Sequence, residues 1–136
     1  MTQNVTVEDM GPQKALVLDF LKTMEARDLE KARTMISSDF VMEFPGSGKM
    51  TRFEDLIAWA KDRYQFVTKT IEDVSTAAKK DGDVVVYCHG MLAGRWKNDV
   101  LFENVRFIDR FVVRDGLIVQ QDVWNDLALH TPDNNK

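Results

Sequence analysis

Apolar residues recur at two different spacings along the chain, which predicts helices in its first half and strands in its second. A first helix should begin at Gly11-Pro12, because proline is tolerated in the first helical turn, and Asp28 should cap a second helix. Thr51, followed three residues later by Glu54, is typical of a capping box that starts a third helix. The apolar stripes of the three helices are Val17, Phe20, Leu21 and Met24; Leu29, Ala32, Met35 and Ile36; and Phe53, Leu56, Ile57, Ala60 and Tyr64.

The rest of the chain predicts strands joined by turns. The predicted strands are 40–44, 70–78 and 84–92, and the predicted loops are 45–48 and 94–99. Asp81-Gly82-Asp83 is typical of a tight turn between two of these strands. Gly90 interrupts a β-rich run, and a glycine in that position suggests a bulge or a strong bend.

The last predicted element is a β-hairpin from Val105 to Leu129, with its turn at Arg114-Asp115-Gly116. Asp-Gly between two apolar runs is a strong signal for a tight hairpin turn. Each run carries one acid in a strand-like setting, Asp109 in the first and Asp122 in the second. A carboxylate on the buried face of a sheet is costly unless it is paired or protonated. These acids therefore either face solvent or lie in a cavity for a chemical reason.

The composition fits one ordinary globular domain. Of the 136 residues, 44% are hydrophobic and 29% are charged, which permits a real core. We expect a single domain over residues 1–136, with loose ends at 1–10 and 130–136. Three helices followed by a bent, mainly antiparallel sheet predict an α+β fold in which the helices cover one face of the sheet.

Charge and cysteine content narrow the classes of function. A net charge of −4 disfavours a nucleic-acid surface, and no apolar run approaches the roughly 20 residues of a membrane span. Cys88 is the only cysteine, which excludes an intramolecular disulfide and a cysteine-based metal cluster. The first residues lack the pattern of a signal peptide, so a cytoplasmic protein is the default expectation.

Two stretches of the sequence resemble the NTF2-like superfamily: VLDFLKTMEARDLEKARTMISSDFVMEFPG near the start and FIDRFVVRDGLIVQQDVWNDL near the end. The resemblance covers roughly residues 12–129 and is to the SnoaL-like branch, which is related to ketosteroid isomerases, limonene epoxide hydrolases and polyketide cyclases. It implies a cone-shaped fold, with three N-terminal helices packed on a strongly curved mixed sheet that encloses a deep apolar pocket, usually in a homodimer. Because this fold hosts many unrelated activities, the resemblance predicts a pocket more firmly than a reaction.

The catalytic residues of these enzymes can be compared with the chain one position at a time. The resemblance places Asp109 at the protonated aspartate of ketosteroid isomerases, whereas Phe20 and Phe44 stand where those enzymes have a tyrosine and an aspartate base. Asp122 matches an aspartate of limonene epoxide hydrolases, but the strand expected to carry their Arg-x-Asp pair lacks it. SnoaL-like cyclases use a histidine and an aspartate, a role that falls on His89 with Asp122 or Asp109.

Alternation along a strand decides which residues share a face with each candidate. Asp109 would lie in an aromatic wall that raises its pKa, so that it could donate a hydrogen bond as a neutral acid; its plainer role is to order the sheet. Asp122 would act as a base or orient His89, or else be a polar residue at the pocket rim. The bend at Gly90 leaves open whether His89 or Cys88 faces the pocket. The predicted pocket-lining residues, which would also serve as core, are Phe20, Phe44, Trp59, Tyr64, Tyr87, Met91, Phe107, Phe111, Gln120 and Trp124.

Two functions fit these expectations. The first is acid–base chemistry without a cofactor on a small, largely apolar carbonyl, hydroxyl or epoxide compound, with Asp122 as base, His89 as proton shuttle and Asp109 as neutral donor. The second is a non-catalytic module that binds a small hydrophobic molecule in the same pocket or a partner protein on the open face of the sheet. We expect a homodimer through the outer sheet face, and no metal, nucleic-acid or membrane partner.

Overall fold

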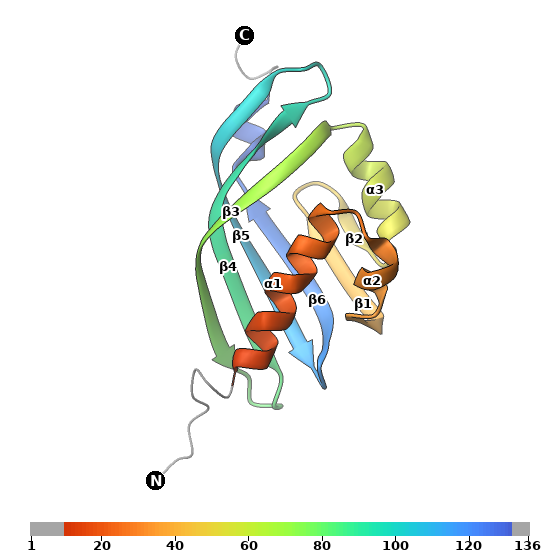
Figure 1. The fold of residues 1–136 in the computed structure, drawn as a ribbon, viewed down its shortest axis with the longest axis vertical. Helices are drawn as coiled ribbons and strands as arrows, with labels where there is room; N and C mark the ends of the chain where they lie inside the picture. The colour runs from red at the N-terminus through yellow and green to blue at the C-terminus, as the bar shows by residue number, and fades with distance from the viewer. Residues whose placement is uncertain (1–9, 132–136) are drawn as a thin grey trace.

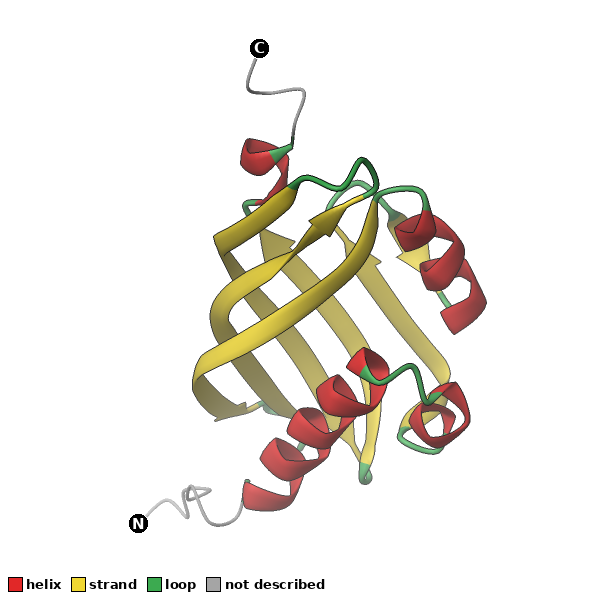
Figure 2. Ribbon diagram, turned by 45° about the horizontal axis from the view of Figure 1, so that its top comes forward, coloured by secondary structure: helices red, strands yellow, loops and turns green. Residues whose placement is uncertain are grey.

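A computed structural model describes residues 10–131 of the chain, in which helices cover one face of a single curved sheet (Figures 1 and 2). The helices are α1 (Gly11–Glu25), α2 (Leu29–Arg33), α3 (Phe53–Lys61) and a short 3-10 helix, η1 (Leu127–His130). The strands are β1 (Ile36–Phe44), β2 (Gly48–Met50), β3 (Tyr64–Ala78), β4 (Val84–Trp96), β5 (Leu101–Arg114) and β6 (Leu117–Asn125). This arrangement confirms the predicted α+β fold.

The sheet has the strand order β2-β1-β6-β5-β4-β3 and is not closed into a barrel. β1 and β6 run parallel, and the other neighbouring strands run antiparallel. The predicted hairpin is formed by β5 and β6. At its turn Asp115 has φ 52° and Gly116 has φ 78°, the two positive values that a type I′ turn requires.

The helical layer is joined to the sheet by a cluster of phenylalanine rings. Phe20 of α1 lies 6.2 Å from Phe40 of β1, 6.1 Å from Phe53 of α3 and 6.0 Å from Phe111 of β5, measured between ring centroids. All four side chains are almost fully buried. Burial of each such ring is worth about 1.5–3 kcal/mol, so this contact fixes the helices over the inner face of the sheet.

The strong curvature of the sheet depends on glycines in β4. A Cβ atom on Gly90 would lie 1.9 Å from the carbonyl oxygen of Thr70, and one on Gly94 would lie 2.2 Å from that of Phe66. The pairing of β3 with β4 shifts register between Ile71 and Asp73, opposite Gly90. The predicted bend near Gly90 is therefore confirmed, with the bulge on the partner strand, while β4 itself continues to Trp96.

Several predicted boundaries were wrong because strand pairing overrides local preference. The second helix ends at Arg33, and the backbone N–H of Ile118 donates to Met35 so that β1 begins at Ile36. Thr51 does not cap α3; Arg52 takes that position without a side-chain cap bond. Glu54 instead forms an ion pair with an arginine of α2.

Three further segments are more extended than predicted. Tyr64, assigned to the stripe of the third helix, begins β3, so that this strand starts six residues before 70–78. Gly48–Met50 forms β2 by pairing with β1, in a place where the end of a loop was predicted. Residues 94–96 of the predicted loop 94–99 belong to β4.

The predicted loose ends lie largely outside the described residues, which exclude 1–9 and 132–136. Met10 is buried in the core. The carbonyl oxygen of His130 accepts a hydrogen bond of 3.0 Å from the indole N–H of Trp96. Between residues 10 and 131, no helix has the length and apolar character needed to cross a membrane.

Substitution of Gly90 by alanine should destabilise the protein by about 3 kcal/mol, because the new methyl group collides with backbone rather than with a side chain that can move. Gly11→Ala is the matched control, since no atom lies within 4 Å of the Cβ position there. Urea unfolding of both variants measures the difference. Equal stability of the two would show that the close approach of β3 to β4 does not set the curvature.

Candidate functional site

Asp109 lies on the inner face of the sheet, beneath the helices. It shares this face with Phe107 and Phe111, as alternation along β5 predicted, and its side chain is 0% exposed. Its Oδ1 atom is buried without a hydrogen-bond partner in the described structure. An acid in such a setting needs a compensating charge or a proton.

Lys69 of β3 supplies the compensating charge. Its Nζ lies 2.5 Å from Oδ2 of Asp109 and 5.1 Å from the ring centroid of Phe107. The two strands are separated by β4, and the lysine reaches across it because β3 folds closely over Gly90 at Thr70, one residue after Lys69. The glycine-dependent bend therefore brings the ion pair together.

The environment acts on the Asp109 carboxyl in two opposing ways. Burial raises the pKa of Asp109 above its ordinary value, and the Lys69 ammonium opposes that rise through its charge and its hydrogen bond. The side chain of Lys69 is 18% exposed, so the pair lies in a low-dielectric setting with one end open.

That open end faces a cavity of about 320 Å³ between the helices and the inner face of the sheet. Most of its wall is apolar, and Lys69, Gln121 and Asn125 contribute polar groups from β3 and β6. Glu25, at the end of α1, is the one carboxylate among the residues that line it. Concave apolar sites with a few polar groups are the usual form of small-molecule sites.

The sequence-predicted pocket residues divide between this cavity, the core and the opposite face. Phe20, Phe44, Tyr64 and Phe107 line the cavity. Phe111 is fully buried in the core, and Trp59 packs against Phe44 with ring centroids 5.7 Å apart. The four others lie on the outer face of the sheet: Tyr87, Met91, Gln120 and Trp124.

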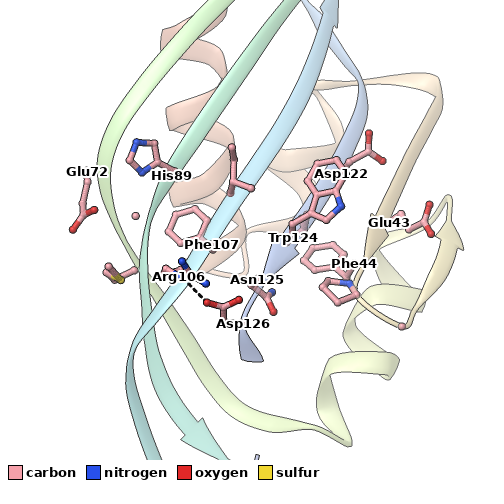
Figure 3. A pocket seen from close by; sticks show the side chains of 16 residues that line it. Glu43, Phe44, Glu72, His89, Arg106, Phe107, Asp122, Trp124, Asn125 and Asp126 are labelled. Atoms are coloured by element: carbon pink, nitrogen blue, oxygen red, sulfur yellow. Dashed lines mark hydrogen bonds and ion pairs between the residues drawn. The ribbon is translucent and has the colours of Figure 1, made fainter. Parts of the chain in front are cut away.

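Asp122 and His89 also lie on the outer face, along an open groove of about 820 Å³ (Figure 3). Asp122 accepts a hydrogen bond of 2.7 Å from Gln120 and lies 3.5 Å from a guanidinium nitrogen of Arg110. His89 is half exposed, with its Nε2 3.8 Å from a carboxylate oxygen of Asp73. The structure therefore does not bring His89 and Asp122 together with Asp109 in one cavity.

Strand register explains this separation. Asp109 is paired with Cys88 on β4 and with Val123 on β6, so these residues share its face. His89 and Asp122 are each one position away and point to the other side, as alternation requires. Both faces of this hairpin carry apolar residues, and the sequence pattern alone could not decide which set would lie under the helices.

Cys88, the alternative inward residue, is fully buried. Burial and the negative charge of Asp109 raise the pKa of its thiol to about 12. The thiol therefore stays protonated near neutral pH, which removes it as a nucleophile. Within residues 10–131, no three histidine, cysteine or carboxylate side chains gather as a metal site.

Lys69 is the site residue that the sequence interpretation missed. The predicted strand began at residue 70, so the lysine fell outside it. The signal that would have found it is alternation: Lys69 stands between Val67 and Ile71, at a position that the pattern assigns to the inner face. A charged residue in the apolar phase of a strand is a candidate for a buried pair.

Comparison with solved structures shows the fold. No protein-family model and no curated protein sequence matches the chain. An NTF2-like protein of unknown function from Burkholderia pseudomallei superposes with a TM-score of 0.71 and 13% identity, over 88% of this chain and 94% of its own. TerC, co-crystallised with polyporic acid, superposes with a TM-score of 0.69 and 16% identity, over 88% of this chain and 95% of its own. IdmH from Streptomyces antibioticus, a candidate polyketide cyclase, superposes with a TM-score of 0.65 and 20% identity, over 86% of this chain and 93% of its own.

Replacement of Lys69 by methionine should leave Asp109 buried without a counter-charge, at a cost of about 3–5 kcal/mol at pH 7. Above the ordinary pKa of the carboxyl, the folded variant holds a proton that the unfolded chain releases. Its stability should therefore fall by up to about 1.4 kcal/mol for each pH unit gained, which urea unfolding between pH 5 and 8 measures.

The double variant Lys69→Met with Asp109→Asn is the control. It lacks the Asp109 carboxyl, so its stability relative to the wild type should not fall with rising pH in this way. A single variant whose pH dependence matches the wild type would show that Lys69 does not control the protonation of Asp109.

Proposed function

The chain has the NTF2-like fold, and from this premise we propose that it binds a small, largely apolar carbonyl compound in the inner cavity and catalyses its enolisation. The observation that carries the proposal is the position of Lys69: it lines the cavity and is ion-paired with the fully buried Asp109. No cofactor is required for this chemistry.

Lys69 is the hydrogen-bond donor to the carbonyl oxygen. As the enolate forms, negative charge develops on that oxygen, and a fixed ammonium in a dry cavity stabilises it more than water would. Asp109 holds the lysine in place through the 2.5 Å contact. The pair takes the place of the neutral Asp109 donor expected from the sequence.

Glu25 is the acceptor of the carbon-bound proton. It is an exposed residue at the end of α1 and lines the same cavity as Lys69. Its carboxylate removes a proton from the carbon beside the carbonyl, the bonding electrons move to the oxygen, and the return of the proton at the same or another carbon completes exchange or isomerisation. Asp122 and His89 take no part, because they lie on the other face of the sheet.

A non-catalytic binding module is the second candidate. Phe20 and Phe44 line the cavity at the two positions where the sequence resemblance to ketosteroid isomerases would put a tyrosine and a base. An apolar wall at those positions favours retention of a hydrophobic ligand over chemistry on it. The two candidates share the cavity and differ in whether Lys69 and Glu25 act on the bound molecule.

Deuterium exchange beside the carbonyl of 2-tetralone, followed by proton NMR, tests the proposal. The wild type should accelerate exchange above the buffer rate. Lys69→Met should lower the acceleration by about 10²–10³-fold, and Glu25→Gln by about 10²-fold. Lys80→Met and Glu30→Gln are exposed matched controls that should leave it unchanged.

The outcomes separate the two candidates. If 2-tetralone binds but exchanges at the buffer rate, the protein is a binding module and the catalytic proposal fails. If the Lys69 variant does not fold, the double variant Lys69→Met with Asp109→Asn provides a folded protein without the cation, and it too should be inactive. Full activity in that double variant would contradict the role of Lys69.

We also propose that the outer face of the sheet is the contact between two copies of the chain. Ile108 and Trp124 lie directly opposite each other on β5 and β6, and they are 36% and 54% exposed. Two ion pairs flank them, Arg110 with Asp122 and Arg106 with Asp126, so that each of these arginines lies beside a carboxylate on this surface. Such a surface can complement itself across a two-fold axis.

Substitution of Trp124 by glutamate should therefore convert a dimer into a monomer, because it places a charge at the centre of the apolar contact. Sedimentation velocity measures the change. Leu129→Glu is the matched control, an exposed apolar residue on η1. A wild type that sediments as a monomer at all accessible concentrations would end this proposal and leave the enzymatic one untouched.

A further inference from the structure

A second groove continues outward from the inner cavity. It has a volume of about 420 Å³, and it lies where the end of α3, the start of β3 and the turn after β4 meet. Its wall shares four residues with that of the cavity, namely Arg27, Ala60, Tyr64 and Gln65. We call it the mouth groove, because it adjoins the cavity along these four residues.

The charges that line the mouth groove are all positive. They are Arg27, Lys61 and Lys97, and no carboxylate lines the groove. This is unexpected in a chain with a net charge of −4. Among residues 10–131, no carboxylate lies within ion-pair distance of these three side chains. The Nζ of Lys97 donates to the backbone carbonyl oxygen of Lys61 at 3.1 Å, which holds the Lys97 ammonium against the end of α3.

Two acids on elements around the groove, Asp99 and Glu25, do not line it. Asp99, in the turn after β4, accepts a hydrogen bond of 2.6 Å from Gln65 and lies 3.7 Å from a guanidinium nitrogen of Arg95. Glu25 lines the inner cavity and not the mouth groove. The three cations therefore remain available to a ligand.

Arg27 provides an independent observation. It follows α1 with φ 62°, in the left-handed conformation that usually belongs to glycine at the end of a helix. Its N–H donates to the carbonyl oxygen of Met24 at 3.0 Å, as such an ending requires. An arginine in this conformation is strained relative to glycine, and the helix ending fixes the position from which its side chain lines both the cavity and the groove.

We propose that the ligand of the inner cavity is an amphiphilic anion, with its apolar body inside and a carboxylate, sulfonate or phosphate in the mouth groove beside Arg27, Lys61 and Lys97. The inference rests on the proposed binding of an apolar body in the cavity, and it adds the charge of the ligand. Inside the cavity the charge of Lys69 is balanced by Asp109. An anionic group is therefore attracted more strongly to the cations of the mouth groove than to that pair.

Two probes with the same apolar body test the inference: 8-anilinonaphthalene-1-sulfonate, which is anionic, and the neutral N-phenyl-1-naphthylamine. Fluorescence titration should give a dissociation constant about tenfold lower for the anionic probe at low salt, and added salt should reduce the difference. The triple variant Arg27→Gln, Lys61→Gln, Lys97→Gln should remove the preference and leave the neutral probe unaffected. Lys80→Gln, in the turn after β3, is the control for loss of one positive charge.

The possible results distinguish failure of the inference from failure of the proposed function. Equal affinity of the wild type for the two probes, or equal weakening of both by the triple variant, would overturn the charge assignment alone. Binding of neither probe would overturn the apolar cavity itself.

Arg27→Gly separates binding from stability. Glycine relieves the left-handed strain, so this variant should unfold at or above the wild-type temperature while it loses part of the preference for the anionic probe. A variant that loses thermal stability and keeps the full preference would show that Arg27 serves only the helix end.

Discussion

The buried ion pair between Lys69 and Asp109 is the constraint on which the inner face depends. A carboxylate with 0% exposure is tolerable only with a counter-charge or a proton, and the counter-charge comes from a strand two positions away in the sheet. To deliver it, β3 must fold over β4, which only glycine at position 90 permits. The curvature at Gly90 and the register of β5 bring the two charges together, and the pair in turn sets the polarity of the cavity wall.

The same geometry gives the two faces of the sheet different uses. The inner face, under the ring cluster around Phe20, holds the cavity and its single ion pair. The outer face carries ion pairs that are partly open to solvent, such as Arg110 with Asp122, and these contribute little to stability. The acid on the inner face, Asp109, therefore belongs to the candidate site, whereas the acid on the outer face, Asp122, forms a surface ion pair.

The fold could be predicted from the sequence because its signals are local. Asp115-Gly116 favours a hairpin turn, and the apolar stripe of α1, with Val17, Phe20 and Leu21, requires a surface to cover. The site could be predicted only in part, because it depends on which face of each strand lies inward. The sequence left open which way both acids face, because both sides of these strands carry apolar residues. Strand pairing places Asp109 on the inner face and places Asp122 and His89 on the outer face. Lys69 was missed because the start of its strand is set by pairing with β4 rather than by local preference.

The charge distribution around the cavity also limits how a ligand can be selected. Because Asp109 neutralises Lys69, this pair offers a hydrogen-bond donor without a net charge to a neutral carbonyl oxygen. Discrimination between neutral and anionic molecules must then come from the cations of the mouth groove, of which Arg27 also lines the cavity. Exposed charges act weakly and are screened by salt, whereas the apolar wall is not. The apolar wall of the cavity thus sets the affinity for the body of the ligand, and the mouth groove sets the preference for its charge. The two properties can be changed separately.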